Sequence, residues 1–221
     1  MNISRRLVAE ALGTMLLLAA IIGSGIMGEH LAGGNTAIAL LANSIATGAA
    51  LVVLISVFGP ISGAHFNPAV TIVAAMSREL PWREACAYIA VQVGAAFIGV
   101  AAAHLMFEQP LFSISHHARS GGAQWWSEFV AAFGLIATVI GSMRSRPGMV
   151  AVVVGAYITA AYWFTASTSF ANPAVTLARA TSDTFAGIRP ADVPPFIFAQ
   201  IAGALAAAGL MRWLMPPPRK N

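Results

Sequence analysis

The sequence predicts an all-α membrane protein with six transmembrane helices and two re-entrant half-helices in an inverted repeat. Of its 221 residues, 58% are hydrophobic and 9% are charged, and the mean hydropathy is +0.76. Soluble chains carry roughly a quarter charged residues. The apolar residues gather in runs of about 20, which is enough to cross a bilayer. Two shorter apolar segments begin with Asn-Pro at corresponding places in the two halves.

The first apolar run, residues 7–27, follows Arg5 and Arg6 and could be mistaken for a cleaved leader. It is too long for a leader core and is interrupted by Glu10, so we predict a retained first span. The runs that predict the other five spans are residues 36–57, 85–106, 126–143, 150–168 and 196–215.

Residues 67–76 and 172–180 are about half a membrane long. Each starts with an asparagine that can cap a helix and a proline that suits the first helical position. We therefore predict a short helix in each segment.

The distribution of basic residues predicts that both termini are cytoplasmic, and we expect the protein to lie in the inner cell membrane. With that orientation, nine basic residues lie inside and three outside, as the positive-inside rule requires. The inside group is Arg5, Arg6, Arg78, Arg83, Arg144, Arg146, Arg212, Arg219 and Lys220, and the outside group is Arg119, Arg179 and Arg189. This scatter between apolar runs argues against nucleic-acid binding, despite a net charge of +4.

Catalytic and metal-binding classes find no support in the sequence. Cys86 is the single cysteine, which rules out an intrachain disulfide and a thiolate-rich metal site. There is no Gly-x-Ser-x-Gly motif, no phosphate loop and no convincing nucleophile–base pair. We predict no enzyme activity, no cofactor and no metal.

The chain repeats itself, with residues 5–107 resembling residues 124–215. Three spans in each half mean that the second half enters the membrane with opposite polarity. We therefore expect a single transmembrane channel domain over residues 1–221. The interrupted segment in matching places of both halves indicates the substrate path. The matching features are Glu10 and Glu128, residues 67–71 and 172–176, and Gln92 and Gln200.

The two half-length segments cannot cross lipid, so they must dip in from opposite faces and meet near the midplane, buried against the spans. Their positive dipole ends then converge, and Asn67 and Asn172 can offer amide donors to a neutral solute. Buried carboxylates could couple protons. We instead predict that Glu10 and Glu128 brace the re-entrant loops, because their placement is symmetric, and that His65 orients the first turn.

Residues 62–71 (Ser-Gly-Ala-His-Phe-Asn-Pro-Ala-Val-Thr) and the second Asn-Pro-Ala resemble the paired boxes of aquaporins and aquaglyceroporins. The resemblance covers essentially the whole chain and implies a passive channel for small neutral solutes that assembles as a homotetramer. It also implies that half-helix dipoles and an arginine exclude cations. The pore boxes would be Asn67, Pro68 and Ala69 with Asn172, Pro173 and Ala174.

The chain departs from the family pattern at Val175, where most members carry an arginine. Counting back from the boxes, with no insertion before the second, places Thr47, Ala160 and Ser169 beside it in the selectivity filter. The set predicts a wide, neutral filter and resembles the aquaporins of bacterial arsenic-resistance operons. The implied solutes are arsenous acid and glycerol, with some water. A water-selective aquaporin and a coupled secondary transporter remain the alternatives.

Arg179 lies four residues after Val175, one helical turn further along the second half-helix. Its side chain should lean back toward the helix N-terminus and could partly replace the missing filter charge. It could equally extend to the outer membrane interface.

Overall fold

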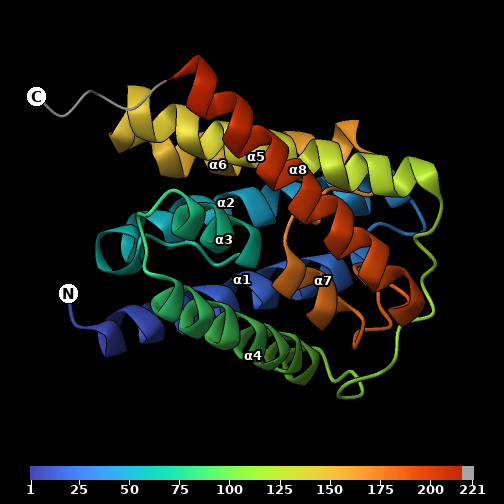
Figure 1. The fold of residues 1–221 in the computed structure, drawn as a ribbon. Helices are drawn as coiled ribbons and strands as arrows, with labels where there is room; N and C mark the ends of the chain where they lie inside the picture. Colours follow the sequence, from blue (N-terminus) through green and yellow to red (C-terminus); the bar gives the residue numbers. More distant parts are fainter. Residues whose placement is uncertain (216–221) are drawn as a thin grey trace, which may run out of the picture.

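The computed structural model describes residues 1–215, so Arg219 and Lys220, counted above as inside, lie outside the described residues. The first half of the described chain forms α1 (Ile3–Leu31), α2 (Thr36–Ser62), α3 (Pro68–Met76) and α4 (Trp82–Met106). The second half forms α5 (Gly122–Ser145), α6 (Val150–Phe164), α7 (Pro173–Arg179) and α8 (Val193–Leu214) (Figure 1). Two 3₁₀ turns, η1 (Pro147–Met149) and η2 (Pro190–Asp192), precede α6 and α8.

The structure confirms the predicted fold class. Six helices of the described chain are long and apolar enough to cross a membrane, and α3 and α7 are the two short ones. The main difference concerns the fifth span. It was predicted to reach residue 168, but α6 ends at Phe164. Thr165 takes an extended backbone conformation, which ends the helix, and Thr168 and Ser169 further along take left-handed conformations.

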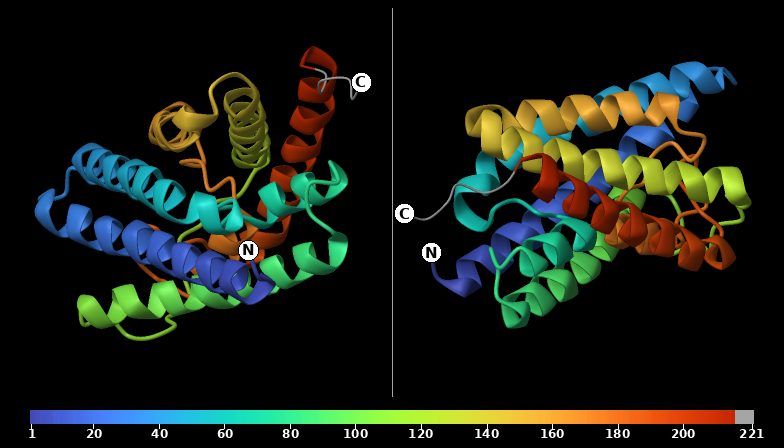
Figure 2. Two further views of the ribbon diagram at one scale, coloured as in Figure 1. Left: turned by 90° about the vertical axis from the view of Figure 1, so that its left-hand side faces the viewer. Right: turned by 45° about the horizontal axis from the view of Figure 1, so that its top comes forward.

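The two halves pack in the same way. α1 packs against α2 and α4, while α5 packs against α6 and α8 (Figure 2). The halves meet most extensively where α2 packs against α6. There a Cβ added to Gly48 would lie 2.8 Å from the carbonyl oxygen of Gly155, and one added to Gly155 would lie 2.6 Å from that of Gly48. Small residues thus let two backbones touch.

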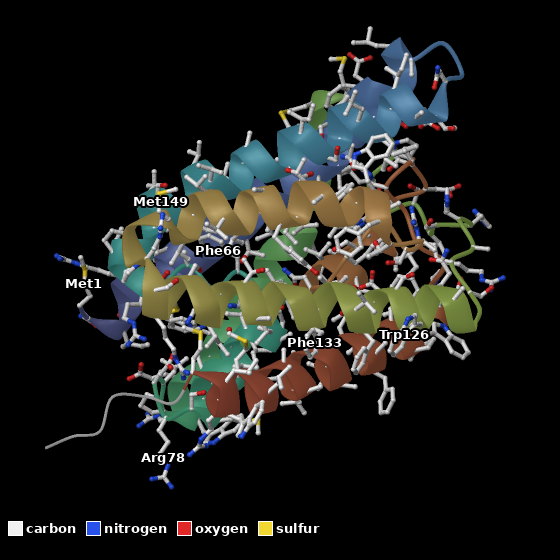
Figure 3. All side chains as sticks on the ribbon, turned by 90° about the horizontal axis from the view of Figure 1, so that it is seen from above. Met1, Phe66, Arg78, Trp126, Phe133 and Met149 are labelled. Carbon is white, nitrogen blue, oxygen red and sulfur yellow. The ribbon has the colours of Figure 1, made fainter. Side chains whose placement is uncertain are left out.

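Several polar side chains are buried between the helices, while many large apolar side chains, Trp126 among them, lie on the outside (Figure 3). Glu10, Gln92, Glu128 and Gln200 are fully buried. Large apolar side chains on the spans are exposed, among them Val8, Ile45, Val53, Ile98 and Phe198. A surface of this kind is stable against lipid rather than water.

Candidate functional site

The two Asn-Pro-Ala boxes meet at the centre of the molecule, and each asparagine has two tasks. The side-chain oxygen of Asn67 caps α3 by accepting from the Ala69 N–H at 2.8 Å. Its amide donates to the carbonyl oxygen of Ala171, before the other box, at 2.8 Å. Asn172 mirrors this arrangement: it accepts from the Ala174 N–H at 3.0 Å and donates to Phe66 at 2.8 Å. Each amide has a second N–H, and both asparagines line the central cavity.

Pro68 and Pro173 each occupy the first helical position, where the missing N–H costs no helical hydrogen bond. Ala69 and Ala174 are 1% and 0% exposed, so a larger side chain at either position would have no space. The box sequence therefore both starts each half-helix and lets the two helix ends approach.

The loop before each box bends through non-glycine residues with positive φ: Ala64 and Phe66 in the first loop, and Thr168, Ser169 and Ala171 in the second. This conformation turns backbone N–H groups away from any secondary structure, and buried N–H groups need partners. A buried carboxylate supplies them in each half.

In the first half, Glu10 accepts from the N–H groups of His65 at 3.0 Å and Phe66 at 2.8 Å. In the second half, Glu128 accepts from the N–H groups of Phe170 and Ala171, both at 2.8 Å. The two carboxylates therefore bind the same two positions relative to their boxes.

A glutamine and a threonine complete each half. Gln92 donates to Glu10 at 2.9 Å and to the Thr71 hydroxyl at 3.0 Å. Gln200 donates to Glu128 at 2.5 Å and to the Thr176 hydroxyl at 2.8 Å. Both threonine hydroxyls donate in turn to the carbonyl oxygen of the box asparagine. The matching positions of the two glutamines in the repeat were the sequence signal for this role.

A cavity of about 340 Å³ runs past both boxes. Its wall on the side of the long helices is mainly apolar, with Leu17, Leu51 and Leu135 among its residues. The half-helices and their preceding loops form the rest of the wall. The lining reaches Glu79 and Arg144 beyond one box and Arg179 beyond the other, so the cavity extends along the pore direction.

Three of the four predicted filter residues line this cavity and are buried: Thr47 and Val175 are 2% exposed and Ser169 is 3% exposed. The prediction for Ala160 was wrong. It lies on the exposed face of α6, and Tyr162 lines the cavity from that helix instead. The Tyr162 hydroxyl lies 3.3 Å from the Thr47 hydroxyl.

The physical reason for the error is the non-helical loop between α6 and the second box, across which a residue count does not fix the rotation of the helix. The spacing of Val154, Ile158 and Tyr162 along one helical face was the signal that could have corrected it. The filter is therefore narrower beside Thr47 than an alanine would make it.

Arg179 is 2% exposed and does not extend to the membrane interface. Its guanidinium lies over the Phe170 ring, 3.4 Å from the ring centroid, and its Nε donates to the carbonyl oxygen of Ala186. Arg179 also lines the cavity. Of the two placements left open for this side chain, the structure has the inward one.

A second buried arginine lies nearby and was missed as a site residue in the sequence. Arg119, 8% exposed, donates to the carbonyl oxygens of Gly187 at 2.8 Å and Ser167 at 3.2 Å. Its guanidinium carbon is 5.0 Å from the Phe170 ring centroid. Burial lowers the pKa of Arg119 to about 10, so it remains charged at neutral pH. No local motif marks it, because only the fold brings the loop after α4 to this place.

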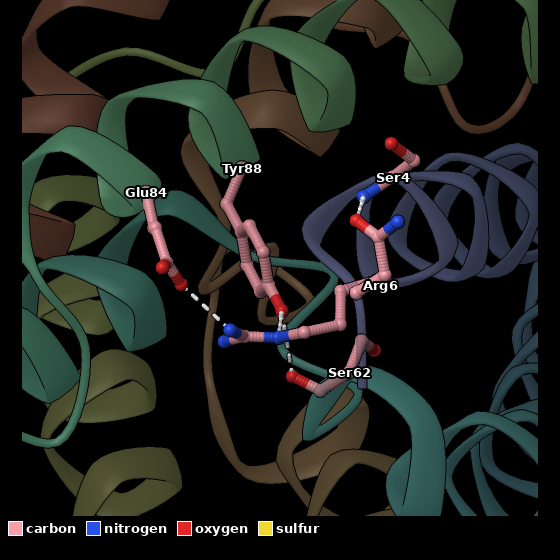
Figure 4. A network of polar contacts seen from close by, with 6 residues as sticks. Ser4, Arg6, Ser62, Glu84 and Tyr88 are labelled. Atoms are coloured by element: carbon pink, nitrogen blue, oxygen red, sulfur yellow. Dashed lines mark hydrogen bonds and ion pairs between the residues drawn. The ribbon is translucent and has the colours of Figure 1, made fainter.

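His65 lies beside a polar network that includes Arg6, Glu84 and Tyr88, which Figure 4 shows. Its Nδ1 lies 3.1 Å from the Thr71 hydroxyl, and its ring packs edge-on against Tyr88 at 5.4 Å. The Tyr88 hydroxyl accepts from Arg6 at 2.7 Å, and Arg6 pairs with Glu84 at 2.6 Å. The N-terminal end of α1 is thereby linked to the loop before the first box.

The sequence matches the family model of the major intrinsic proteins over residues 1–149 and 144–221. The chain belongs to this family. It is 57% identical over 218 residues to the aquaglyceroporin AqpS of Rhizobium meliloti, covering 99% of this chain and 93% of that protein. It is 30% identical to the aquaporin NIP6-1 of Arabidopsis thaliana, covering 94% of this chain and 68% of that protein.

A solved structure supports the fold independently. The X-ray structure of the aquaglyceroporin from Plasmodium falciparum superimposes with a TM-score of 0.76 at 20% sequence identity, covering 98% of each chain. This major intrinsic protein is therefore a multi-pass membrane protein. Like other members of the family, it is a channel for small solutes and not an enzyme.

Proposed function

We propose that this protein is a passive channel whose solutes include glycerol and arsenous acid as well as water. The observation that carries the proposal is the mixed lining of the cavity around the second box. Phe170 and Val175 supply apolar surface, while Thr47, Tyr162 and Ser169 carry hydroxyl groups. Glycerol combines the same two features, C–H groups and hydroxyl groups.

Two further arguments support these solutes. The relative from Rhizobium meliloti at 57% identity is named an aquaglyceroporin. Arsenous acid is a neutral trihydroxide that resembles glycerol, so a wall suited to one offers the same hydrogen bonds to the other. Val175 removes from the filter the bulky guanidinium that most family members carry there, which favours solutes larger than water.

We propose that Glu10 and Glu128 brace the two re-entrant loops, with His65 helping to orient the first. Each carboxylate accepts two backbone N–H groups and one glutamine amide, and Glu10 also accepts from Ser62 at 2.6 Å. A proton taken up by either carboxylate would compete with these bonds. This use of the carboxylates speaks against a coupled transporter.

We also propose a single channel domain in the inner membrane, with both termini cytoplasmic and one pore per subunit of a homotetramer. The excess of basic residues at one side supports the orientation, and the exposed apolar faces and small residues of the spans allow subunits to pack. Native mass spectrometry in mild detergent should find tetramers; a stable monomer alone would contradict the assembly.

Flux into proteoliposomes tests the solute assignment. Vesicles holding the wild-type protein are exposed side by side to gradients of water, glycerol and arsenous acid, with protein-free vesicles and Val175→Trp, which narrows the filter, as controls. We expect glycerol and arsenous acid to enter at rates proportional to concentration and independent of proton or sodium gradients. Water flux without glycerol flux would indicate a water-selective aquaporin. Dependence on an ion gradient would indicate a transporter.

A further inference from the structure

We propose that Arg179, rather than a residue directly after the second box, supplies the cationic hydrogen-bond donor of this pore. A terminal nitrogen of its guanidinium would bind a hydroxyl group of each passing solute, and its charge would hold cations out. This inference rests on the proposed function and identifies a residue that determines its specificity.

The guanidinium of Arg179 is fixed in orientation on two sides. It stacks on Phe170, and its Nε donates to Ala186. Phe170 is fixed in turn, because its ring packs edge-on against Phe196 at 5.4 Å and its backbone N–H is bound by Glu128. A planar guanidinium on an aromatic face loses little freedom when it binds a solute.

In the described part of the chain, the one hydrogen bond of this guanidinium comes from Nε, so neither terminal nitrogen has a protein partner. Within residues 1–215, Nη1 of Arg179 is buried and makes no hydrogen bond, and the same holds for the Ser169 hydroxyl. Both residues line the same cavity. Leaving such polar atoms unpaired is unfavourable, so a solute hydroxyl or a water in this cavity could complete the bonding of either residue.

Val175 explains how the guanidinium reaches this place. Residues 175 and 179 lie on the same face of α7, and helical side chains lean toward the helix N-terminus. A valine at the earlier position leaves room for the longer side chain from the next turn. The absence of an arginine at 175 and the inward position of Arg179 are therefore complementary.

Within residues 1–215, the charge of Arg179 is not paired in a salt bridge. Neither Arg179 nor Arg119 forms a salt bridge with an acidic side chain in the described part of the chain. Both guanidinium groups lie near Phe170, so two positive charges flank the same part of the pore. A cation entering there meets repulsion that a neutral polyol does not.

The experiment measures glycerol, water and sodium permeability of proteoliposomes carrying wild-type protein, Arg179→Met, Arg179→Lys or the exposed control Arg83→Met. Arg179→Met keeps an unbranched side chain against Phe170 but loses charge and donor. We expect its glycerol-to-water ratio to fall roughly tenfold, as the loss of one hydrogen bond to a charged group would cause, and its sodium leak to rise. Retained water flux would show that the pore is intact.

Arg179→Lys should keep sodium out but lose part of the glycerol preference, because an ammonium lacks the planar fork. If Arg179→Met does not fold, the lysine variant still tests whether Arg179 sets the solute preference. Arg83→Met should match the wild type. If wild-type glycerol flux is present and both Arg179 variants keep its ratio and its low sodium leak, this inference is wrong while the proposed function stands. If the wild type passes no glycerol, the proposed function itself fails.

Discussion

The loops before the two boxes are built on the same frame but have different neighbours. In each, a carboxylate holds two backbone N–H groups, a glutamine links that carboxylate to a threonine, and an asparagine donates to the opposite loop. The residue two before the box, however, is His65 in one loop and Phe170 in the other. His65 contacts Thr71 and Tyr88, whereas Phe170 carries the guanidinium of Arg179.

This comparison separates what a re-entrant loop needs from what a selective pore needs. Left-handed backbone inside a membrane requires fixed hydrogen-bond acceptors, and a carboxylate in each half accepts from matching backbone positions. The choice of solute requires an asymmetric wall, and it is built from residues that the repeat does not share. Changes to the frame should therefore damage both halves alike, while changes near Phe170 should alter selectivity.

The largest effect on stability should come from the two carboxylates that hold the re-entrant loops. We expect Glu10→Gln and Glu128→Gln each to cost about 3 kcal/mol or more, because the new amide turns a donor toward a buried backbone N–H. For a chain of this size that corresponds to a fall of roughly 10 °C in the melting midpoint. Thermal unfolding of the detergent-solubilised protein measures it.

Glu29→Gln, an exposed carboxylate on α1, is the matched control and should leave the midpoint unchanged. A large loss in only one of the two buried variants would contradict the equivalence of the halves.

Val175→Arg should have an intermediate effect confined to permeation. The added guanidinium would enter a site that Val175, 2% exposed, already fills beside Arg179. Glycerol and arsenous acid flux should fall about tenfold, an added barrier of about 1.4 kcal/mol, and water flux should fall less. Thr47→Phe should act in the same direction. If Val175→Arg folds, reaches the membrane and conducts as the parent does, Val175 does not line the constriction.

The smallest effect should distinguish the two neighbouring residues of α6. Ala160→Leu adds bulk on the exposed face and should leave solute flux per channel unchanged. Tyr162→Phe removes only a hydroxyl and should change glycerol flux by roughly twofold at most, a change of about 0.4 kcal/mol in the permeation barrier. Vesicle swelling rates, corrected for protein content, measure both. A strong flux loss in Ala160→Leu with Tyr162→Phe silent would restore the filter predicted from spacing.

The sequence by itself determined the six spans, the two half-helices and the pairing of Glu10 with Glu128 and Gln92 with Gln200. Span length and helix-start residues are local signals, and the internal repeat is found by comparing the sequence with itself. All three can therefore be read without a structure. Tertiary structure decided that Tyr162 rather than Ala160 faces the cavity, that Arg179 points inward, and that Arg119 joins it. Each depends on helix rotation or on contact between segments distant in the chain. A residue count across an irregular loop fixes neither, because every non-helical residue between a helix and a box can change the angle at which that helix presents its side chains.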